Sequence, residues 1–296
     1  MLRDFLKLLA AALFLSLVAA ISLAGGVHAA QPGDSPQPVS LAYGTAPLQR
    51  LDFWPAIKAN PGPAPLILFV HGGAWQHGNK DNATGKLKDG YFTQLGYAFA
   101  SIDYRLVPDV RVEDQAQDVA DAAAYLVHRS RELGLDPHRV VLMGHSAGAH
   151  LVALVGTDPR YLAKAGLTLD DIRGIVAIDG AAYSIPEQMH DAGWFMRRTY
   201  ETAFGTSPER QQALSPVHHA PRPNVQNFLI LHVQRTDGIR QAKLLEDALK
   251  ASGTHVERQE FPGDGLRGHV EINRRLGDPD YPPTTAVRDW LARTFQ

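Results

Sequence analysis

Short, wholly apolar runs alternate along the chain with longer runs that have a helical period. Residues 66–70 and 140–143 are apolar at every position, which is typical of strands buried on both faces of a sheet. The pattern predicts strands over residues 39–43, 49–54, 66–70, 98–103, 140–143, 175–178, 228–233 and 255–261, and helices over 112–131 and 239–251. Such alternation predicts an α/β fold, a mostly parallel twisted sheet with helices on both faces.

Residues 183–224 interrupt this alternation. A connection of that length between two strands is rarely structureless, so we expect it to be helical and to lie over the functional site as a lid. The alternative is a surface insertion without a role in the site. The segment contains bulky apolar side chains among its charges and a proline-rich end: Trp194, Phe195, Met196, Tyr200 and Phe204, then Pro216, Pro221 and Pro223.

Ser146 stands where an apolar run ends and a helix-forming run begins. The pentapeptide G-H-S-A-G, residues 144–148, follows the strand 140–143. A serine on a sharp turn between strand and helix projects its hydroxyl out of the sheet, and the crowded backbone requires small flanking residues. Such a hydroxyl becomes a nucleophile when a base accepts its proton and donors stabilise the oxyanion. The pattern predicts Ser146 as the nucleophile; the alternative is an ordinary turn serine.

Two glycines follow the strand 66–70, in the segment H-G-G-A-W of residues 71–75. Glycines at this point allow backbone N–H groups to turn toward a bound anion, because no Cβ blocks the approach. The alternative is a glycine turn that only lets the chain leave the sheet. We expect an oxyanion hole in which Gly72 permits the turn, His71 holds the loop by hydrogen bonds, and the N–H donors are those of Gly73, Ala74 and Ala147.

With these motifs the chain resembles the α/β-hydrolase superfamily, in particular its H-G-G-x-W esterase branch, near the hormone-sensitive-lipase-like and feruloyl- and acetyl-xylan-esterase-like groups. Residues 101–106 resemble the D-Y-R-L strand end of that family, and residues 134–140 resemble its lead-in to the nucleophile strand. Ala74 departs from the lipase-like branch, which has a third glycine there, whereas Trp75 fits the H-G-G-x-W branch. The resemblance extends from about residue 43 to the C-terminus, and it implies the α/β-hydrolase fold with a helical lid insertion.

The base follows the nucleophile and the acid in the chain order of this fold. His150 lies one turn into the helix after Ser146, and His232 and His255 fall inside predicted strands. His269 follows the last predicted strand in the glycine-flanked loop 263–269, just before a helix, where the family places its base. We therefore predict His269 as the base. The other histidines after Ser146 are His190, His218 and His219, of which the last two remain open as alternatives.

A carboxylate must hold that base in the correct tautomer. Asp237 follows the strand 228–233, and residues at the carboxyl ends of parallel strands converge on one site, so Asp237 is the predicted acid. Asp264 is close to His269 in sequence, but we expect it to cap a turn. Asp179 follows the strand 175–178, and we expect a structural role for it. The predicted triad is Ser146, Asp237 and His269.

Composition excludes several classes of protein. The 296 residues, 45% of them hydrophobic, are enough for one large domain, expected over residues 39–296. The 29 basic and 31 acidic residues give a net charge of −2, which argues against nucleic-acid binding. The chain has no cysteine, which excludes disulfides, thiolate chemistry and a lipid anchor on Cys. No residue spacing predicts a metal site and no glycine-rich loop predicts a nucleotide, so no cofactor is expected.

The N-terminal segment predicts export. Arg3 and Lys7 precede an apolar stretch over residues 8–24, and the residues V-H-A at 27–29 suit a signal peptidase. We expect residues 1–29 to be a cleaved signal peptide and residues 30–38 a flexible lead-in, with the protein in the periplasm or secreted and without stable membrane association. The alternative is an uncleaved anchor, since the apolar stretch is slightly long for a signal peptide, although slightly short for a spanning helix.

These features predict an exported serine hydrolase, free of metal and cofactor, that cleaves carboxylic esters through an acyl-enzyme. Its expected partner is a small-molecule ester, and the aromatic residues of 183–224 favour short acyl groups. The closest alternative is an amide hydrolase of the arylformamidase type, which shares the H-G-G-x-W feature. A non-catalytic binding module on the same fold is the alternative from another class. The natural acyl and alcohol groups and the oligomeric state stay open.

Overall fold

An eight-stranded sheet organises residues 37–57 and 62–296, which are the residues that the structure, a computed structural model, describes. The expected signal peptide 1–29 and most of the lead-in 30–38 lie outside them. The order across the sheet is β1-β2-β4-β3-β5-β6-β7-β8; β2 is antiparallel to β1 and β4, and all other neighbours are parallel. The strands are β1 Val39–Ala42, β2 Arg50–Trp54, β3 Ala64–Val70, β4 Ala98–Ile102, β5 Leu135–His145, β6 Gly174–Ile178, β7 Asn227–Val233 and β8 His255–Phe261.

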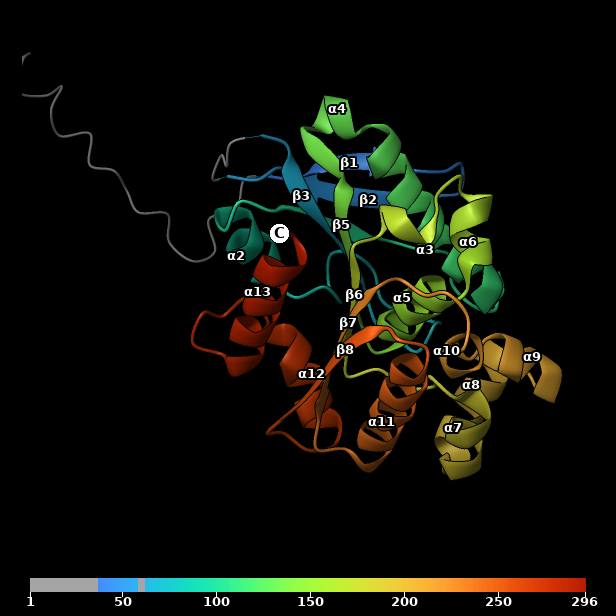
Figure 1. Cartoon of the computed structure of the whole chain (residues 1–296). Coiled ribbons are helices and arrows are strands. Elements are labelled where there is room, and N and C mark those ends of the chain that lie inside the picture. Colours follow the sequence, from blue (N-terminus) through green and yellow to red (C-terminus); the bar gives the residue numbers. More distant parts are fainter. Residues whose placement is uncertain (1–36, 58–61) are drawn as a thin grey trace, which may run out of the picture. The chain divides into compact units, whose positions relative to one another are not determined.

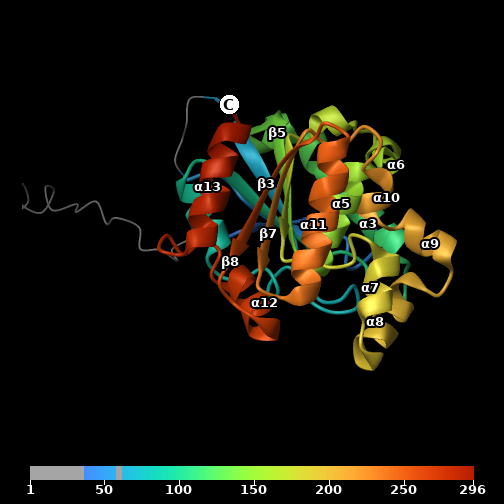
Figure 2. The same ribbon diagram turned by 60° about the horizontal axis from the view of Figure 1, so that its bottom comes forward.

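Alternate side chains of the central strands pack into two cores, one on each face of the sheet. In β3, Leu66 and Leu68 belong to one core, while Ile67 and Phe69 belong to the other. The first core is covered by α3 Val112–His128, α5 Ala147–Thr157, α6 Pro159–Lys164 and α11 Thr236–Ala251. The second is covered by α2 Lys88–Gln94, α12 Gly265–Arg274 and α13 Pro282–Thr294 (Figures 1 and 2). The expected mostly parallel sheet with helices on both faces is confirmed.

Two helix boundaries differ from the prediction in ways that matter for the site. Helix α11 begins at Thr236 instead of residue 239, so Asp237 lies in its first turn. Helix α12 begins at Gly265, so His269 lies inside a helix and not in the loop before one. Gly263 and Gly265 have φ values of +133° and +51°, which let the chain turn from β8 into α12 within three residues. Elsewhere the predicted helix 112–131 is divided into α3 and the short α4 Ser130–Leu133, and η1 Leu169–Asp171 precedes β6.

Four helices occupy most of the segment 183–224, between β6 and β7. They are α7 Ile185–Asp191, α8 Trp194–Phe204, α9 Pro208–Ala213 and α10 Pro216–His219. Prolines stand in the first turn of α7, α9 and α10, where their missing N–H costs no hydrogen bond. Figure 2 shows α7, α8 and α9 grouped beside α11 and α3. Among the described residues, no helix combines the length and apolar character needed to cross a membrane.

Candidate active site

Ser146 lies on a tight turn between β5 and α5. Its backbone has φ +57° and ψ −119°, an uncommon conformation for a residue with a side chain. A Cβ on Gly144 would lie 2.3 Å from the carbonyl oxygen of Gly148, and a Cβ on Gly148 would lie 2.1 Å from that of Val70. Both contacts are with backbone carbonyl oxygens, which cannot move aside as a flexible side chain could. Only glycine therefore fits at positions 144 and 148. This is the physical reason for the G-x-S-x-G spacing.

His269 links Ser146 to a carboxylate. Its Nε2 lies 3.0 Å from Ser146 Oγ, and its Nδ1 lies 2.5 Å from Asp179 Oδ2. Because an ionised carboxylate only accepts, Nδ1 carries the proton and Nε2 is left to accept from the serine hydroxyl. The geometry is that of a serine paired with a base that a carboxylate orients. The other histidines after Ser146 lie on α5 (His150), α7 (His190), α10 (His218 and His219), β7 (His232) and β8 (His255).

The acid predicted from sequence does not contact the base. Asp237 accepts from Arg235 Nη1 at 3.0 and 3.1 Å, and no hydrogen bond joins it to His269 in the described part of the chain. The structure therefore contradicts the prediction that Asp237 holds His269, since the carboxylate in contact with this histidine is Asp179. The physical reason is that α11 begins one residue before Asp237 and Arg235 lies between the two carboxylates. Asp264 immediately precedes α12 and, in residues 62–296, makes no hydrogen bond to His269 either.

Asp179 is fully buried, with 0% of its side chain exposed, and has three donors. Besides His269, they are the backbone N–H of Val233 at 3.1 Å from Oδ1 and Nε of Arg235 at 3.0 Å from Oδ2. Burial raises the pKa of Asp179, but the hydrogen bond from His269 and the charge of Arg235 outweigh it, so the pKa lies below its usual value. Asp179 is therefore ionised at neutral pH and can stabilise an imidazolium.

The loop after β3 lies against the nucleophile. A Cβ on Gly72 would lie 2.9 Å from Ser146 Cβ, and Ala74 and Ala147 line the same cavity as Ser146. Within the described residues, the backbone N–H groups of Gly73, Ala74 and Ala147 make no hydrogen bond to a backbone carbonyl. The loop after β3 and the start of α5, which hold the four residues predicted for an oxyanion hole, thus both lie close to Ser146.

Buried aromatic side chains hold this loop. His71 Nδ1 donates to the Gly72 carbonyl at 2.7 Å, and the His71 ring stacks on Tyr104 at 4.3 Å between centroids. The Tyr104 hydroxyl donates to the His71 carbonyl at 2.9 Å. Burial lowers the pKa of His71 to about 4, so this side chain is neutral. His71 therefore holds the loop, as expected from the sequence.

Trp75 ties the same loop to the segment 183–224. Its Nε1 donates to His150 Nδ1 at 3.3 Å, and Nε2 of His150 donates to the Leu214 carbonyl at 2.9 Å. The Trp75 ring also contacts Phe204 edge-on, with 4.7 Å between centroids. The position of the loop 71–75 thus depends on α5 and on the helices after β6.

His145 is a site residue that the sequence interpretation missed. Its ring lies 4.6 Å from the His269 ring, and its Nε2 donates to the His269 carbonyl at 2.9 Å. Burial holds the pKa of His145 well below its usual range, so it is a neutral support for His269. His145 occupies the unspecified position of G-x-S-x-G, so the motif gives no signal for it. Arg235 was also missed, because its contacts with Asp179 and Asp237 are visible only in the folded chain.

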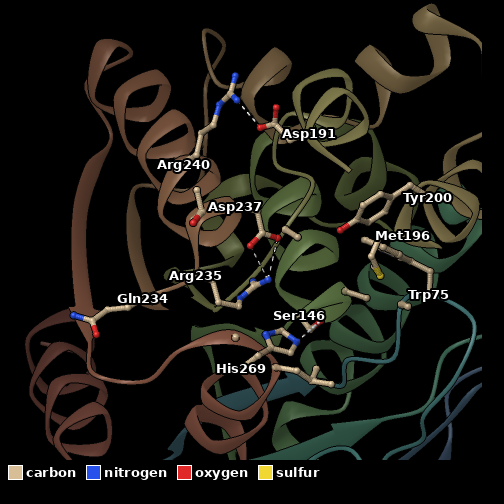
Figure 3. A pocket seen from close by; sticks show the side chains of 16 residues that line it. Trp75, Ser146, Asp191, Met196, Tyr200, Gln234, Arg235, Asp237, Arg240 and His269 are labelled. Carbon is tan, nitrogen blue, oxygen red and sulfur yellow. Dashed lines mark hydrogen bonds and ion pairs between the residues drawn. The ribbon is translucent and has the colours of Figure 1, made fainter. Parts of the chain in front are cut away.

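Ser146 and His269 lie in a cavity of about 890 Å³. Figure 3 shows Trp75, Met196 and Tyr200 on one side of it, and Gln234, Arg235, Asp237 and Arg240 across from them. Met196 and Tyr200 come from α8, so the segment 183–224 supplies part of the wall. One wall is therefore mainly apolar and the other charged. In residues 37–57 and 62–296, no group of three or more His, Asp or Glu side chains is arranged to hold a metal ion.

The sheet, the serine turn and the His269 contacts define an α/β-hydrolase fold. Solved structures show the same fold: esterase B from Lactobacillus Rhamnosis has a TM-score of 0.73 at 20% identity, covering 100% of this chain and 96% of that one. A butyrate-bound esterase, Est2, from Thermogutta terrifontis has a TM-score of 0.68 at 23% identity, covering 87% and 94%. At these identities the likeness concerns the fold.

The chain belongs to the BD-FAE family, whose model matches residues 51–249. Esterase LipC of Mycobacterium tuberculosis is 32% identical to it over 234 residues, which cover 75% of this chain. The match spans 58% of the length of LipC. The relation to esterase-type α/β-hydrolases that the motifs predicted is confirmed.

Proposed function

We propose that the protein is a serine hydrolase that cleaves carboxylic esters through an acyl-enzyme. In this proposal Ser146 is the nucleophile, His269 the base and Asp179 the carboxylate that orients it. The observation that carries the proposal is the hydrogen-bonded series from Ser146 Oγ through His269 to Asp179, at the wall of an open cavity. The esterase name of LipC and the esterase neighbours in structure support the same reaction class.

The reaction follows from these positions. Ser146 Oγ attacks the ester carbonyl carbon while His269 Nε2 takes the hydroxyl proton, and the carbonyl oxygen becomes an oxyanion that the N–H groups of Gly73, Ala74 and Ala147 bind. Asp179 stabilises the imidazolium. The imidazolium then gives its proton to the leaving alcohol oxygen, and the C–O bond breaks to leave an acyl-enzyme. Water, activated by His269, cleaves the acyl-enzyme and restores Ser146.

The test is the variant Ser146→Ala with p-nitrophenyl acetate as substrate. Removal of the nucleophile lowers kcat by about 10⁴-fold or more, while the thermal unfolding midpoint stays close to that of the wild type. A fluorophosphonate probe labels the wild type and not the variant. Ser40→Ala, an exposed serine on β1, is the matched control and keeps full activity and labelling. Near-native hydrolysis by Ser146→Ala would contradict the proposal, and a formanilide assay separates ester from amide hydrolysis.

We further propose a preference for short acyl groups. Because His269 must reach the leaving oxygen, the alcohol part lies on the His269 side and the acyl part on the side of Trp75, Met196 and Tyr200. Trp75 and Tyr200 are buried, and so the acyl side is bounded by bulky, well-packed rings. We expect p-nitrophenyl acetate or butyrate to be the best of an acyl series, with a broad tolerance for the alcohol. Tyr200→Ala then moves the optimum to longer chains; a wild-type optimum at long chains would refute this preference.

We also propose that residues 1–29 direct export and are then removed. Arg3, Lys7 and the apolar stretch that follows support this, as does the small-residue site at 27–29. Mass spectrometry of protein from the periplasm of a bacterial host should find an N-terminus near residue 30. An intact Met1 in the membrane fraction would instead favour an anchor.

A further inference from the structure

Arg235 joins the buried carboxylate of Asp179 to a second carboxylate in the cavity wall. Its Nε donates to Asp179 Oδ2 at 3.0 Å, and its Nη1 donates to both oxygens of Asp237 at 3.0 and 3.1 Å. Figure 3 shows the guanidinium between Asp237 and the region of Ser146 and His269. Charges therefore alternate in sign from Asp179 to Arg235 to Asp237.

The guanidinium has two opposing effects on the base. A buried carboxylate without a counter-charge is costly, so Arg235 keeps Asp179 ionised and in place while His269 is neutral. The same positive charge weakens the attraction between Asp179 and the imidazolium that forms during the reaction. Asp237 offsets this second effect, because it neutralises the guanidinium from the side away from His269.

We propose that Arg235 is a positioning residue that sets the orientation and effective charge of Asp179, and that Asp237 acts on His269 only through Arg235. This inference rests on the proposed esterase function. It explains why an arginine occupies the turn between β7 and α11, and it gives Asp237 an indirect role in place of the direct one expected from sequence. Arg235 is only 15% exposed, so water screens its charge poorly.

The other titratable groups that face this network include charged side chains: Asp191 and Arg240 line the same cavity as Asp237, and Arg258 contacts His232. Burial lowers the pKa of His145 and His232 and raises the pKa of Tyr183, Tyr200 and Tyr281. Lys88 on α2 acts on His145 through its charge, and burial lowers the pKa of Lys88 to about 7. Lys88 titrates in wild type and variants alike, so differences between their pH profiles report the change made at residue 235 or 237.

The experiment measures kcat/KM for p-nitrophenyl acetate against pH. At low pH, kcat/KM falls as His269 becomes protonated, and this part of the profile is called the acid limb here. Arg235→Gln removes the positive charge, so the His269 imidazolium becomes easier to form. The acid limb therefore moves to higher pH by about 0.5–1 unit. Asp237→Asn leaves the guanidinium uncompensated, so the acid limb moves the other way by about 0.5 unit, and kcat falls less than about tenfold. A merely structural role for either residue lowers kcat without moving the limb. Asp247→Asn, an exposed aspartate on α11 paired with Lys243, is the matched control and leaves the limb in place.

The double variant Arg235→Gln/Asp237→Asn tests whether Asp237 acts through Arg235. The expected acid limb coincides with that of Arg235→Gln alone. An equal shift by Asp237→Asn in both backgrounds, or limbs that do not move in an active enzyme, would overturn this inference alone. If Arg235→Gln does not fold, the test depends on Asp237→Asn alone, and the acid limb of this variant must lie at lower pH than that of the wild type. A wild type that neither hydrolyses esters nor reacts with a fluorophosphonate would overturn the proposed function instead.

Discussion

The carboxyl ends of β6 and β7 are neighbours in the sheet and each is followed by an aspartate, but the two carboxylates have different surroundings. Asp179 comes directly after β6, has φ +43° and is fully buried with three donors. Asp237 comes four residues after β7, inside the first turn of α11, with 34% of its side chain exposed. The difference shows that a carboxylate at a strand end reaches the base only if the chain turns at that residue.

The largest effect that separates the two strand ends is on catalysis. Asp179→Asn removes the anion that holds the His269 tautomer, and we expect kcat to fall by about 10⁴-fold, as for the acid of other serine triads. Asp237→Asn, the matched substitution at the end of β7, should lower kcat far less. Steady-state kinetics with p-nitrophenyl acetate, together with thermal unfolding of both variants, measures this. The reverse ranking would mean that Asp237 is the acid after all.

The end of β5 is a third strand end that can be compared with those of β6 and β7. The turn that follows β5 leaves no room for a side chain, because backbone atoms lie close to its glycines. A Cβ at residue 148 would lie 2.1 Å from the Val70 carbonyl oxygen, so Gly148→Ala must displace β3 or α5. We expect a loss of about 3 kcal/mol in the free energy of unfolding, at the upper end for overpacking. Gly193→Ala, where a Cβ meets open space, should cost less than about 1 kcal/mol. Urea unfolding measures both, and equal costs would contradict the steric account of the turn.

The pH dependence of stability sharpens the account of Asp179. Its pKa in the folded protein lies below the unfolded value, so its ionisation contributes stability that is present above the unfolded pKa and lost as the pH falls through the folded one. The free energy of unfolding of Asp179→Asn should therefore depend less steeply on pH than that of the wild type, below about pH 4. Denaturant titrations from pH 6 to pH 2.5 measure the slopes. Parallel slopes would show that Asp179 is not held as an anion.

The smallest effect is expected at the contact between α11 and α7 in the cavity wall. Arg240 pairs there with Glu187 and Asp191 of α7, and its side chain is largely exposed. Solvent-exposed ion pairs contribute little, so Arg240→Ala should change the free energy of unfolding by less than about 1 kcal/mol. A larger loss, insensitive to added salt, would mean that this contact holds α7 in place and is more than a surface ion pair.

Several features follow from local sequence alone. The positions of the strands are visible because residues buried on both faces leave uninterrupted apolar runs, such as residues 66–70. Ser146 and its glycines are visible because the turn tolerates only glycine at the positions two before and two after the serine. His269 could be selected because it follows the last strand. The first residues of the helices were harder to predict from the sequence. For example, α12 begins before His269 because the glycines at 263 and 265 turn the chain early.

The identity of the acid could not be read from the same patterns. Asp179 and Asp237 both follow apolar strands, and the local sequence favours neither. The choice depends on contacts between residues far apart in the chain: Asp179 and His269 are separated by 90 positions and Asp179 and Arg235 by 56. Local sequence was enough to predict the strands, the turn at Ser146 and the choice of His269, because these depend on nearby residues. The contacts of His269 with Asp179 and His145, and the pairing of Arg235 with Asp179, became visible only in the folded chain, because β5, β6, β7 and α12 come together only once the sheet is assembled.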